Sequence, residues 1–152
     1  MGERRKSREV LLQLLFQAEM NRNEEPRKLL SHFWGNLGKS FIRTPEICER
    51  AEKLFQGVLE KRSALDHTIE EASQNWKMSR MSLVDRNILR LACYELLYCK
   101  DVPKEVVFDE AIEIAKRYGT EESPGFINGI LDKISSQTCG NVNHCKKSSA
   151  LL

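Results

Sequence analysis

Residues 101–134, DVPKEVVFDEAIEIAKRYGTEESPGFINGILDKI, contain the sequence pattern that decides the fold. Apolar residues recur at helical spacing after Pro103, whose missing N–H costs nothing in the first turn of a helix. We expect Gly119 to end this helix in the left-handed conformation, and Ser123 to cap the next helix beside Pro124. The stretch therefore predicts two amphipathic helices joined by a polar loop.

The preceding residues show the same helical pattern, beginning with a first helix over about residues 6–20. Further helix starts are indicated by prolines or by hydroxyl and acidic residues at capping positions: Pro26, Thr44 with Pro45, Ser63 with Asp66, and Ser82 with Asp85. The most apolar run, residues 83–98, is expected to have Leu91 or Glu95 at the edge of its buried face. Because strict apolar–polar alternation is absent, the chain is predicted to be all-α, with about seven helices.

These helices are expected to form one domain over residues 1–135. A division into two small bundles, residues 4–75 and 80–135, fits the pattern, and neither half alone would bury much surface, so the two should pack together. After Ser135 the helical periodicity is lost, and residues 136–152 are expected to be a disordered tail.

The composition is that of an ordinary globular protein of 152 residues, with 41% hydrophobic and 30% charged residues. No apolar run approaches the roughly 20 residues that a membrane-spanning helix needs. Five cysteines without regular spacing suit a reducing compartment, so a cytoplasmic location is expected.

No enzyme motif is present, and we predict neither catalytic residues nor a cofactor. Neighbouring acidic residues such as Asp109 and Glu110 point in different directions on a helix. The Cys139, His144 and Cys145 group lacks a fourth ligand, so no metal site is predicted.

The net charge of +2 does not by itself indicate a nucleic-acid binder, but the charge is unevenly distributed. Four cations occupy five positions near the start: Arg4, Arg5, Lys6 and Arg8. Arginines at spacings of three and four share a helix face, and their guanidinium groups suit phosphates and unstacked bases of single-stranded RNA. A merely solvated helix start is the alternative, although positive charge there opposes the helix dipole.

Four segments, in this order, resemble those of the NusB family of bacterial transcription antitermination factors. They are RRKSREVLLQLLFQAE at 4–19, VDRNILRLACYELLY at 84–98, EAIEIAKRYG at 110–119 and FINGILDKI at 126–134. The likeness covers nearly the whole chain from Arg4 to Ile134 and is strongest from Ser82 onward.

The resemblance implies a non-catalytic protein of two small helical bundles. It would bind the boxA element of nascent ribosomal RNA transcripts together with NusE, a small-subunit ribosomal protein, in an antitermination complex that helps RNA polymerase pass terminators. The RNA-binding positions would be Arg4, Arg5, Lys6, Arg8, Phe16, Arg86, Glu122 and Phe126. The acidic positions expected to face the basic partner are Asp85, Asp109, Glu110 and Glu113.

Two other interpretations stay open. NusB-like domains also assist RNA binding in certain ribosomal RNA cytosine methyltransferases, but no methyl-donor-binding region follows within these 152 residues. The protein could instead be a helical adaptor that binds only proteins. Self-association is left open by the sequence.

Overall fold

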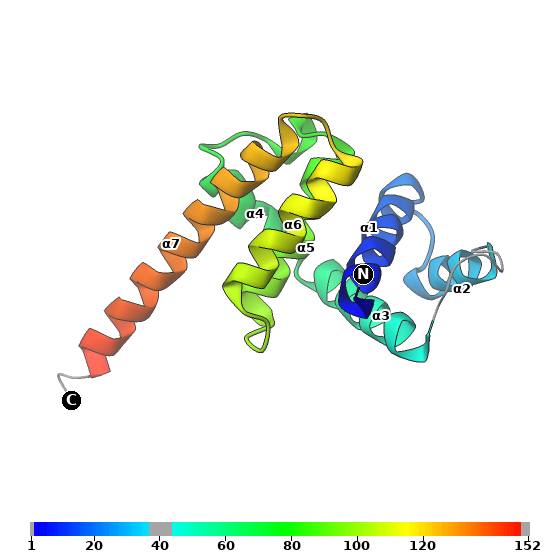
Figure 1. Cartoon of the computed structure of the whole chain (residues 1–152), viewed down its shortest axis with the longest axis horizontal. Coiled ribbons are helices and arrows are strands. Elements are labelled where there is room, and N and C mark those ends of the chain that lie inside the picture. Colours follow the sequence, from blue (N-terminus) through cyan, green and yellow to red (C-terminus); the bar gives the residue numbers. More distant parts are fainter. Residues whose placement is uncertain (1, 37–43, 150–152) are drawn as a thin grey trace.

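A computed structural model describes the backbone of residues 2–36 and 44–149 and the side chains of residues 2–35 and 44–137. Within these residues it confirms the all-α prediction, with seven α-helices and one 3₁₀ turn (Figure 1). The elements are α1 (Glu3–Met20), α2 (Pro26–Asn36), α3 (Pro45–Glu60), α4 (Arg62–Ala72), η1 (Met78–Arg80), α5 (Leu83–Tyr98), α6 (Lys104–Tyr118) and α7 (Ser123–Ser149).

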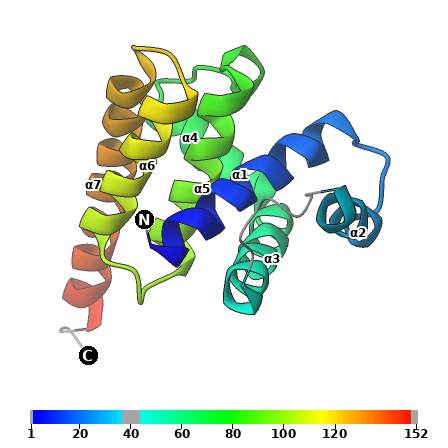
Figure 2. The same cartoon turned by 45° about the vertical axis from the view of Figure 1, so that its right-hand side comes forward.

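Two packed bundles make up the molecule. Helices α1, α2 and α3 form the first, and α4 to α7 form the second, as Figures 1 and 2 show from two directions. The boundary expected at residues 75–80 is wrong, because α4 packs mainly against α5 and α7 and so belongs to the second bundle. The bundles therefore divide at Lys61, between α3 and α4.

Helix α5 is the central element, because it packs against α1 and α3 of the first bundle as well as α4, α6 and α7 of the second. Its apolar positions, including Ile88, Leu89 and Ala92, are buried as predicted. Leu91 and Glu95 do not mark an exposed edge, since both are almost fully buried. A helix covered on most sides must pair any charge that it carries.

Two predicted helix starts are confirmed by their cap hydrogen bonds. The Ser82 hydroxyl accepts a bond of 3.1 Å from the backbone N–H of Asp85, and the Thr44 hydroxyl accepts one of 3.3 Å from that of Ile47. These bonds satisfy N–H groups that have no partner within the first helical turn.

Two other local expectations are wrong. Ser63 does not cap α4, which begins one residue earlier at Arg62 without a side-chain cap. Gly119 ends α6 in an extended conformation, with φ −95° and ψ −166°, rather than a left-handed one. Ser123 is the first residue of α7, and its hydroxyl accepts from the backbone N–H of Thr120 at 3.0 Å.

The expected disordered tail is also corrected, since α7 continues through residue 136 to Ser149. Cys139, His144 and Cys145 have side chains outside the described set, so the structure does not place them. Among the described residues, no helix combines the length and apolar character required to cross a membrane.

Candidate nucleic-acid interface

The basic cluster lies on the first two turns of α1, because the helix extends back to Glu3. Arg4 is exposed and Lys6 is half-buried, and neither side chain forms an ion pair with a described carboxylate. Both cations are therefore available to a negatively charged ligand.

Arg5 is bound to α6 through Glu110, which lies 105 positions away in the sequence. Its Nε and Nη2 atoms donate to the two carboxylate oxygens at 2.7 and 3.0 Å. This hydrogen-bonded pair raises the pKa of Arg5 and lowers the pKa of Glu110. One residue predicted for RNA and one predicted for the protein partner thus neutralise each other.

Arg8 does not face solvent as the predicted RNA-binding set required. It forms a bidentate ion pair with Glu95 of α5, in which Nε and Nη2 donate to the two carboxylate oxygens at 2.8 and 2.9 Å. Only 2% of each side chain is exposed. Burial by itself lowers the pKa of Arg8, but the hydrogen bonds and charge of Glu95 reverse that effect and raise it. Arg8 belongs to the core, and its partner Glu95 was not anticipated as a functional residue.

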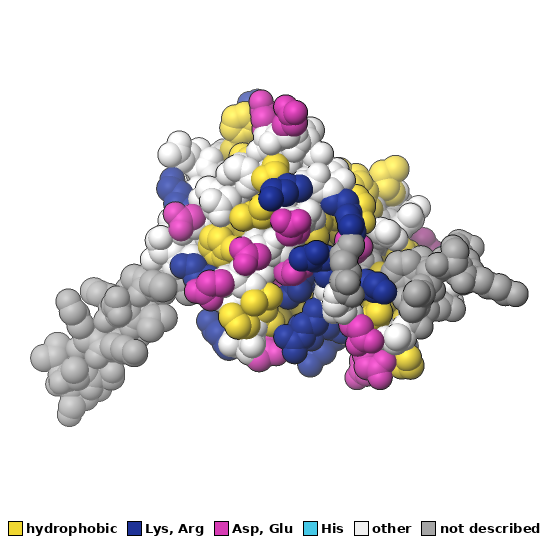
Figure 3. Space-filling model, viewed as in Figure 1, with side chains coloured by type: hydrophobic (Ala, Val, Ile, Leu, Met, Phe, Trp, Pro, Cys, Tyr) yellow, Lys and Arg dark blue, Asp and Glu magenta, His cyan; other side chains and the backbone are white. Residues whose placement is uncertain are grey.

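A groove of about 230 Å³ follows the junction of α1 and α6, lined by charges of both signs. Arg117 of α6 pairs with Glu9 of α1 at 2.6 Å, and Lys116 lies 3.4 Å from Glu113 on the same helix. In Figure 3 basic and acidic side chains are interspersed over this face rather than segregated. A ligand here would meet alternating charge, not a continuous basic surface.

The predicted aromatic contacts, Phe16 and Phe126, are half-buried and pack against the hydrophobic core. Each leaves part of its ring accessible for stacking, a contact that single-stranded RNA commonly makes. Glu122 is exposed just before α7, where its carbonyl accepts from the N–H of Phe126.

At the start of α5, Asp85 and Arg86 have different environments. One carboxylate oxygen of Asp85, Oδ1, is buried without a hydrogen-bond partner, so it remains an unused acceptor. Arg86 donates from Nε and Nη2 to Glu19 at the end of α1, and from Nη1 to the carbonyl of Met81 at 3.4 Å.

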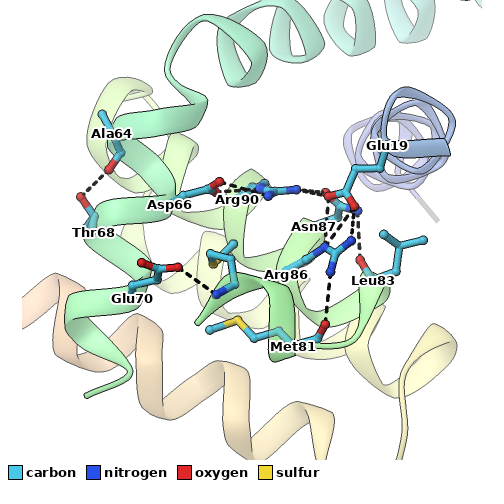
Figure 4. A network of polar contacts seen from close by, with 11 residues as sticks. Glu19, Ala64, Asp66, Thr68, Glu70, Met81, Leu83, Arg86, Asn87 and Arg90 are labelled. Carbon is cyan, nitrogen blue, oxygen red and sulfur yellow. Dashed lines mark hydrogen bonds and ion pairs between the residues drawn. The ribbon is translucent and has the colours of Figure 1, made fainter. Parts of the chain in front are cut away.

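Arg86 belongs to a polar network that the sequence did not reveal (Figure 4). The Glu19 carboxylate binds both Arg86 and Arg90, and Arg90 continues to Asp66 of α4 at 2.7 and 3.1 Å. Asn87 accepts from Arg90 at 2.9 Å and donates to the carbonyl of Leu83. The network joins α1, α5 and α4. In the sequence it could have been suspected only from the two arginines within the otherwise apolar run that forms α5.

The acidic residues expected to face a partner are only partly accessible. Asp109 and Glu113 are exposed on α6, whereas Glu110 is half-buried against Arg5. The structure therefore places the acidic side of α6 directly beside the start of α1.

No group of three potential metal ligands occurs among the described residues. The three described cysteines, Cys48, Cys93 and Cys99, are free thiols, and burial raises the pKa of Cys93 to about 12. These thiols give no indication of a metal centre or a reactive nucleophile.

Comparison with known proteins places this arrangement in a family. The sequence profile of the NusB family matches residues 5–136. The chain is 47% identical over 131 residues to the transcription antitermination protein NusB of Desulfitobacterium hafniense, covering 86% of each chain. It is 44% identical over 135 residues to that of Sorangium cellulosum, covering 89% of this chain and 93% of the relative.

Solved structures give the same result. T. maritima NusB superposes with a TM-score of 0.78 at 43% identity, covering 90% of this chain and 92% of that one. A crystal structure of the antitermination factors NusB and NusE in complex with dsRNA matches with a TM-score of 0.78 at 26% identity, over 90% and 98% of the two chains. The chain belongs to the NusB family.

Proposed function

We propose that this protein is an RNA-binding transcription antitermination factor. It binds boxA-type RNA of nascent ribosomal RNA transcripts together with NusE, and the complex promotes read-through by RNA polymerase. The observation that carries the proposal is the match along nearly the whole chain to relatives named as transcription antitermination proteins, in a fold solved elsewhere with NusE and RNA.

The mechanism is recognition without bond chemistry. Arg4 and Lys6 would hold backbone phosphates, because they are the cations of the basic cluster that no described carboxylate neutralises. Phe16 and Phe126 would stack with unpaired bases through the accessible parts of their rings.

The partner surface follows from the acidic side of α6. Asp109 and Glu113 are exposed for a basic protein, and Glu110 links that surface to the RNA-binding end of α1 through Arg5. A ribosomal protein bound there would add positive charge beside Arg4 and tighten RNA binding through shared contacts.

The test is fluorescence anisotropy of a labelled boxA-type RNA across a salt series, with and without NusE. We expect NusE to tighten binding and a scrambled RNA to bind more weakly. Arg4→Glu/Lys6→Glu should weaken binding and reduce the slope of log affinity against log salt by about 0.7 for each lost phosphate contact.

The matched control is Lys53→Glu/Lys133→Glu, which makes the same charge change at exposed positions of α3 and α7. Arg8 is unsuitable for charge reversal, because a glutamate there would face buried Glu95. If boxA-type and scrambled RNA bound equally with NusE present, the protein would be a helical adaptor rather than an RNA-binding factor.

A further inference from the structure

A second charged groove, away from the basic start of α1, lies between the two bundles. It has a volume of about 290 Å³ and is formed by the end of α1, the start of α4, η1 and the start of α5. Four arginines line it, namely Arg22, Arg62, Arg86 and Arg90, together with Glu19 and Ser79. We refer to it as the arginine groove.

The arginine groove carries more positive charge than its carboxylates neutralise. Glu19 is shared by Arg86 and Arg90, and Arg90 is also bound by Asp66 of α4. The guanidinium groups of Arg22 and Arg62 form no hydrogen bond or ion pair with any described residue. Two of the four arginines therefore face the groove without a counter-charge.

The other two arginines of the groove, Arg86 and Arg90, are held in place by ion pairs. Figure 4 shows Arg86 and Arg90 held side by side on α5 by the Glu19 carboxylate. Arg86 keeps 17% of its side chain exposed, so the fixed guanidinium still reaches solvent. A fixed cation beside two unpaired ones suits a phosphate group, whose oxygens accept several guanidinium bonds at once.

An apolar recess adjoins the arginine groove, and Arg22 and Arg62 line both. The recess has a volume of about 310 Å³, and its apolar lining includes Ala18, Leu29 and Phe55. Asn21 and Glu24 are its other polar lining residues, and the Glu24 carboxylate lies 2.7 Å from Nδ1 of His32. Ligand-binding pockets are mostly apolar, with a few polar groups that orient the ligand. A pocket of this kind beside a cationic groove suits a ligand that has a flat ring and a phosphate.

We propose that the arginine groove and this recess together bind one nucleotide. Its phosphate contacts Arg22, Arg62 and Arg86, and its base enters the recess. The nucleotide has two sources, a residue of a bound RNA strand or a free mononucleotide. The RNA source rests on the function proposed above, whereas the mononucleotide source does not.

The experiment uses the full chain and AMP, measured by isothermal titration calorimetry and by the NMR signals of the arginine Nε–H groups. AMP should bind more tightly than inorganic phosphate or adenosine, because only AMP fills both parts of the site. It should shift the signals of Arg22, Arg62 and Arg86. Arg22→Gln/Arg62→Gln should weaken AMP binding about tenfold or more, because two charge-assisted contacts are lost.

The control Lys53→Gln/Lys133→Gln removes the same charge outside both hollows and should leave AMP binding unchanged. Because Arg22 and Arg62 form no hydrogen bond or ion pair with a described residue, their replacement should also leave the far-UV circular dichroism spectrum and melting temperature of the protein unchanged. The signal shifts in the unmodified protein give a second readout that does not depend on any variant.

Labelled single-stranded RNA then separates the two sources. If the Arg22/Arg62 variant weakens RNA binding more than the control does, the site takes a nucleotide of the RNA. If it weakens only AMP binding, the site takes a free nucleotide. If AMP shifts no arginine signal and the variant binds RNA as the control does, the proposal is overturned. Failure of boxA recognition would leave AMP binding intact, so the two proposals fail separately.

Discussion

Arg8 and Glu95 form an ion pair inside the protein, where each side chain is 2% exposed. A buried pair gains little over apolar residues of similar size, but removal of one partner leaves an uncompensated charge. We expect Arg8→Met to lower the free energy of unfolding by about 3–5 kcal/mol. Urea denaturation followed by circular dichroism measures this loss.

The double variant Arg8→Met/Glu95→Leu is the control, because it removes both charges and should recover most of the lost stability. A loss below about 1 kcal/mol for the single variant would mean that the pair is solvated, since exposed ion pairs contribute about that much or less.

Arg8 also shows where prediction of the site from sequence ends. Spacing correctly placed Arg4, Arg5 and Arg8 on the start of one helix, but it could not say which of them faces solvent. That depends on carboxylates far along the chain, Glu110 for Arg5 and Glu95 for Arg8. The number of basic residues at the start of the chain therefore overestimated how many cations are available to RNA.

Gly119 illustrates, at the scale of one element, a glycine required by close packing rather than by backbone conformation. A Cβ added there would lie 2.5 Å from the Ser123 hydroxyl oxygen and 2.8 Å from the Ala115 carbonyl oxygen. We expect Gly119→Ala to lower the free energy of unfolding by about 1–3 kcal/mol. The added methyl group would overlap with Ser123 and with the Ala115 carbonyl, and the connection between α6 and α7 would have to shift to make room for it. Thermal and urea denaturation measure the change.

The matched substitution is Gly125→Ala in the first turns of α7, where an added Cβ meets nothing within 4 Å. Alanine is favoured over glycine in a helix by about 1 kcal/mol, so this variant should be as stable as the natural protein or more stable. Equal effects of the two substitutions would contradict the packing explanation for Gly119.

The elements themselves were largely predictable from sequence. Helical periodicity gave the fold class, and local cap chemistry gave the starts of α3 and α5 at Thr44 and Ser82. The placement of α4 was missed, because helical periodicity identifies an apolar face but not the helices against which it packs, here α5 and α7. The end of α6 was predicted wrongly, because the glycine at position 119 was attributed to a left-handed conformation, whereas the backbone is extended and Ser123 of the next helix leaves no room for a side chain.

At the scale of the whole molecule, Glu19 joins the bundles by binding Arg86 and Arg90 of α5. Burial by itself raises the pKa of Glu19, but hydrogen bonds from the two arginines outweigh it, and the pKa lies below its ordinary value. The unfolded chain therefore takes up this proton near pH 4.3, before the folded protein does. Stability from Glu19 is complete above that pH and is lost as the pH falls through the folded pKa.

We therefore expect Glu19→Gln to lower stability at pH 7 and to flatten the decline in unfolding free energy as the pH falls below about 5. Urea denaturation at stepped pH measures both effects. Glu105→Gln changes an exposed carboxylate of α6 that forms no ion pair with a described residue, so its curve should follow that of the natural protein. Parallel curves for Glu19→Gln and the natural protein would rule out this linkage.

The same network, together with the packing of α1 on α5, predicts that the two bundles unfold as one cooperative unit. The two tryptophans test this, because Trp34 lies on α2 of the first bundle and Trp76 lies between α4 and η1 of the second. In Trp76→Phe the remaining fluorescence reports on the first bundle, and in Trp34→Phe on the second. Circular dichroism reports on all helices in both.

Within each variant, fluorescence and circular dichroism should give the same urea midpoint, even if loss of the Trp34 hydrogen bond to Glu52 shifts both midpoints together. Fluorescence of Trp34 that changes at lower urea than the circular dichroism signal would show that the first bundle opens separately. The buried contacts of α1 with α5 would then be too weak to couple the bundles. Coincident midpoints would mean that the arginine groove, built from both bundles, exists only in the fully folded protein.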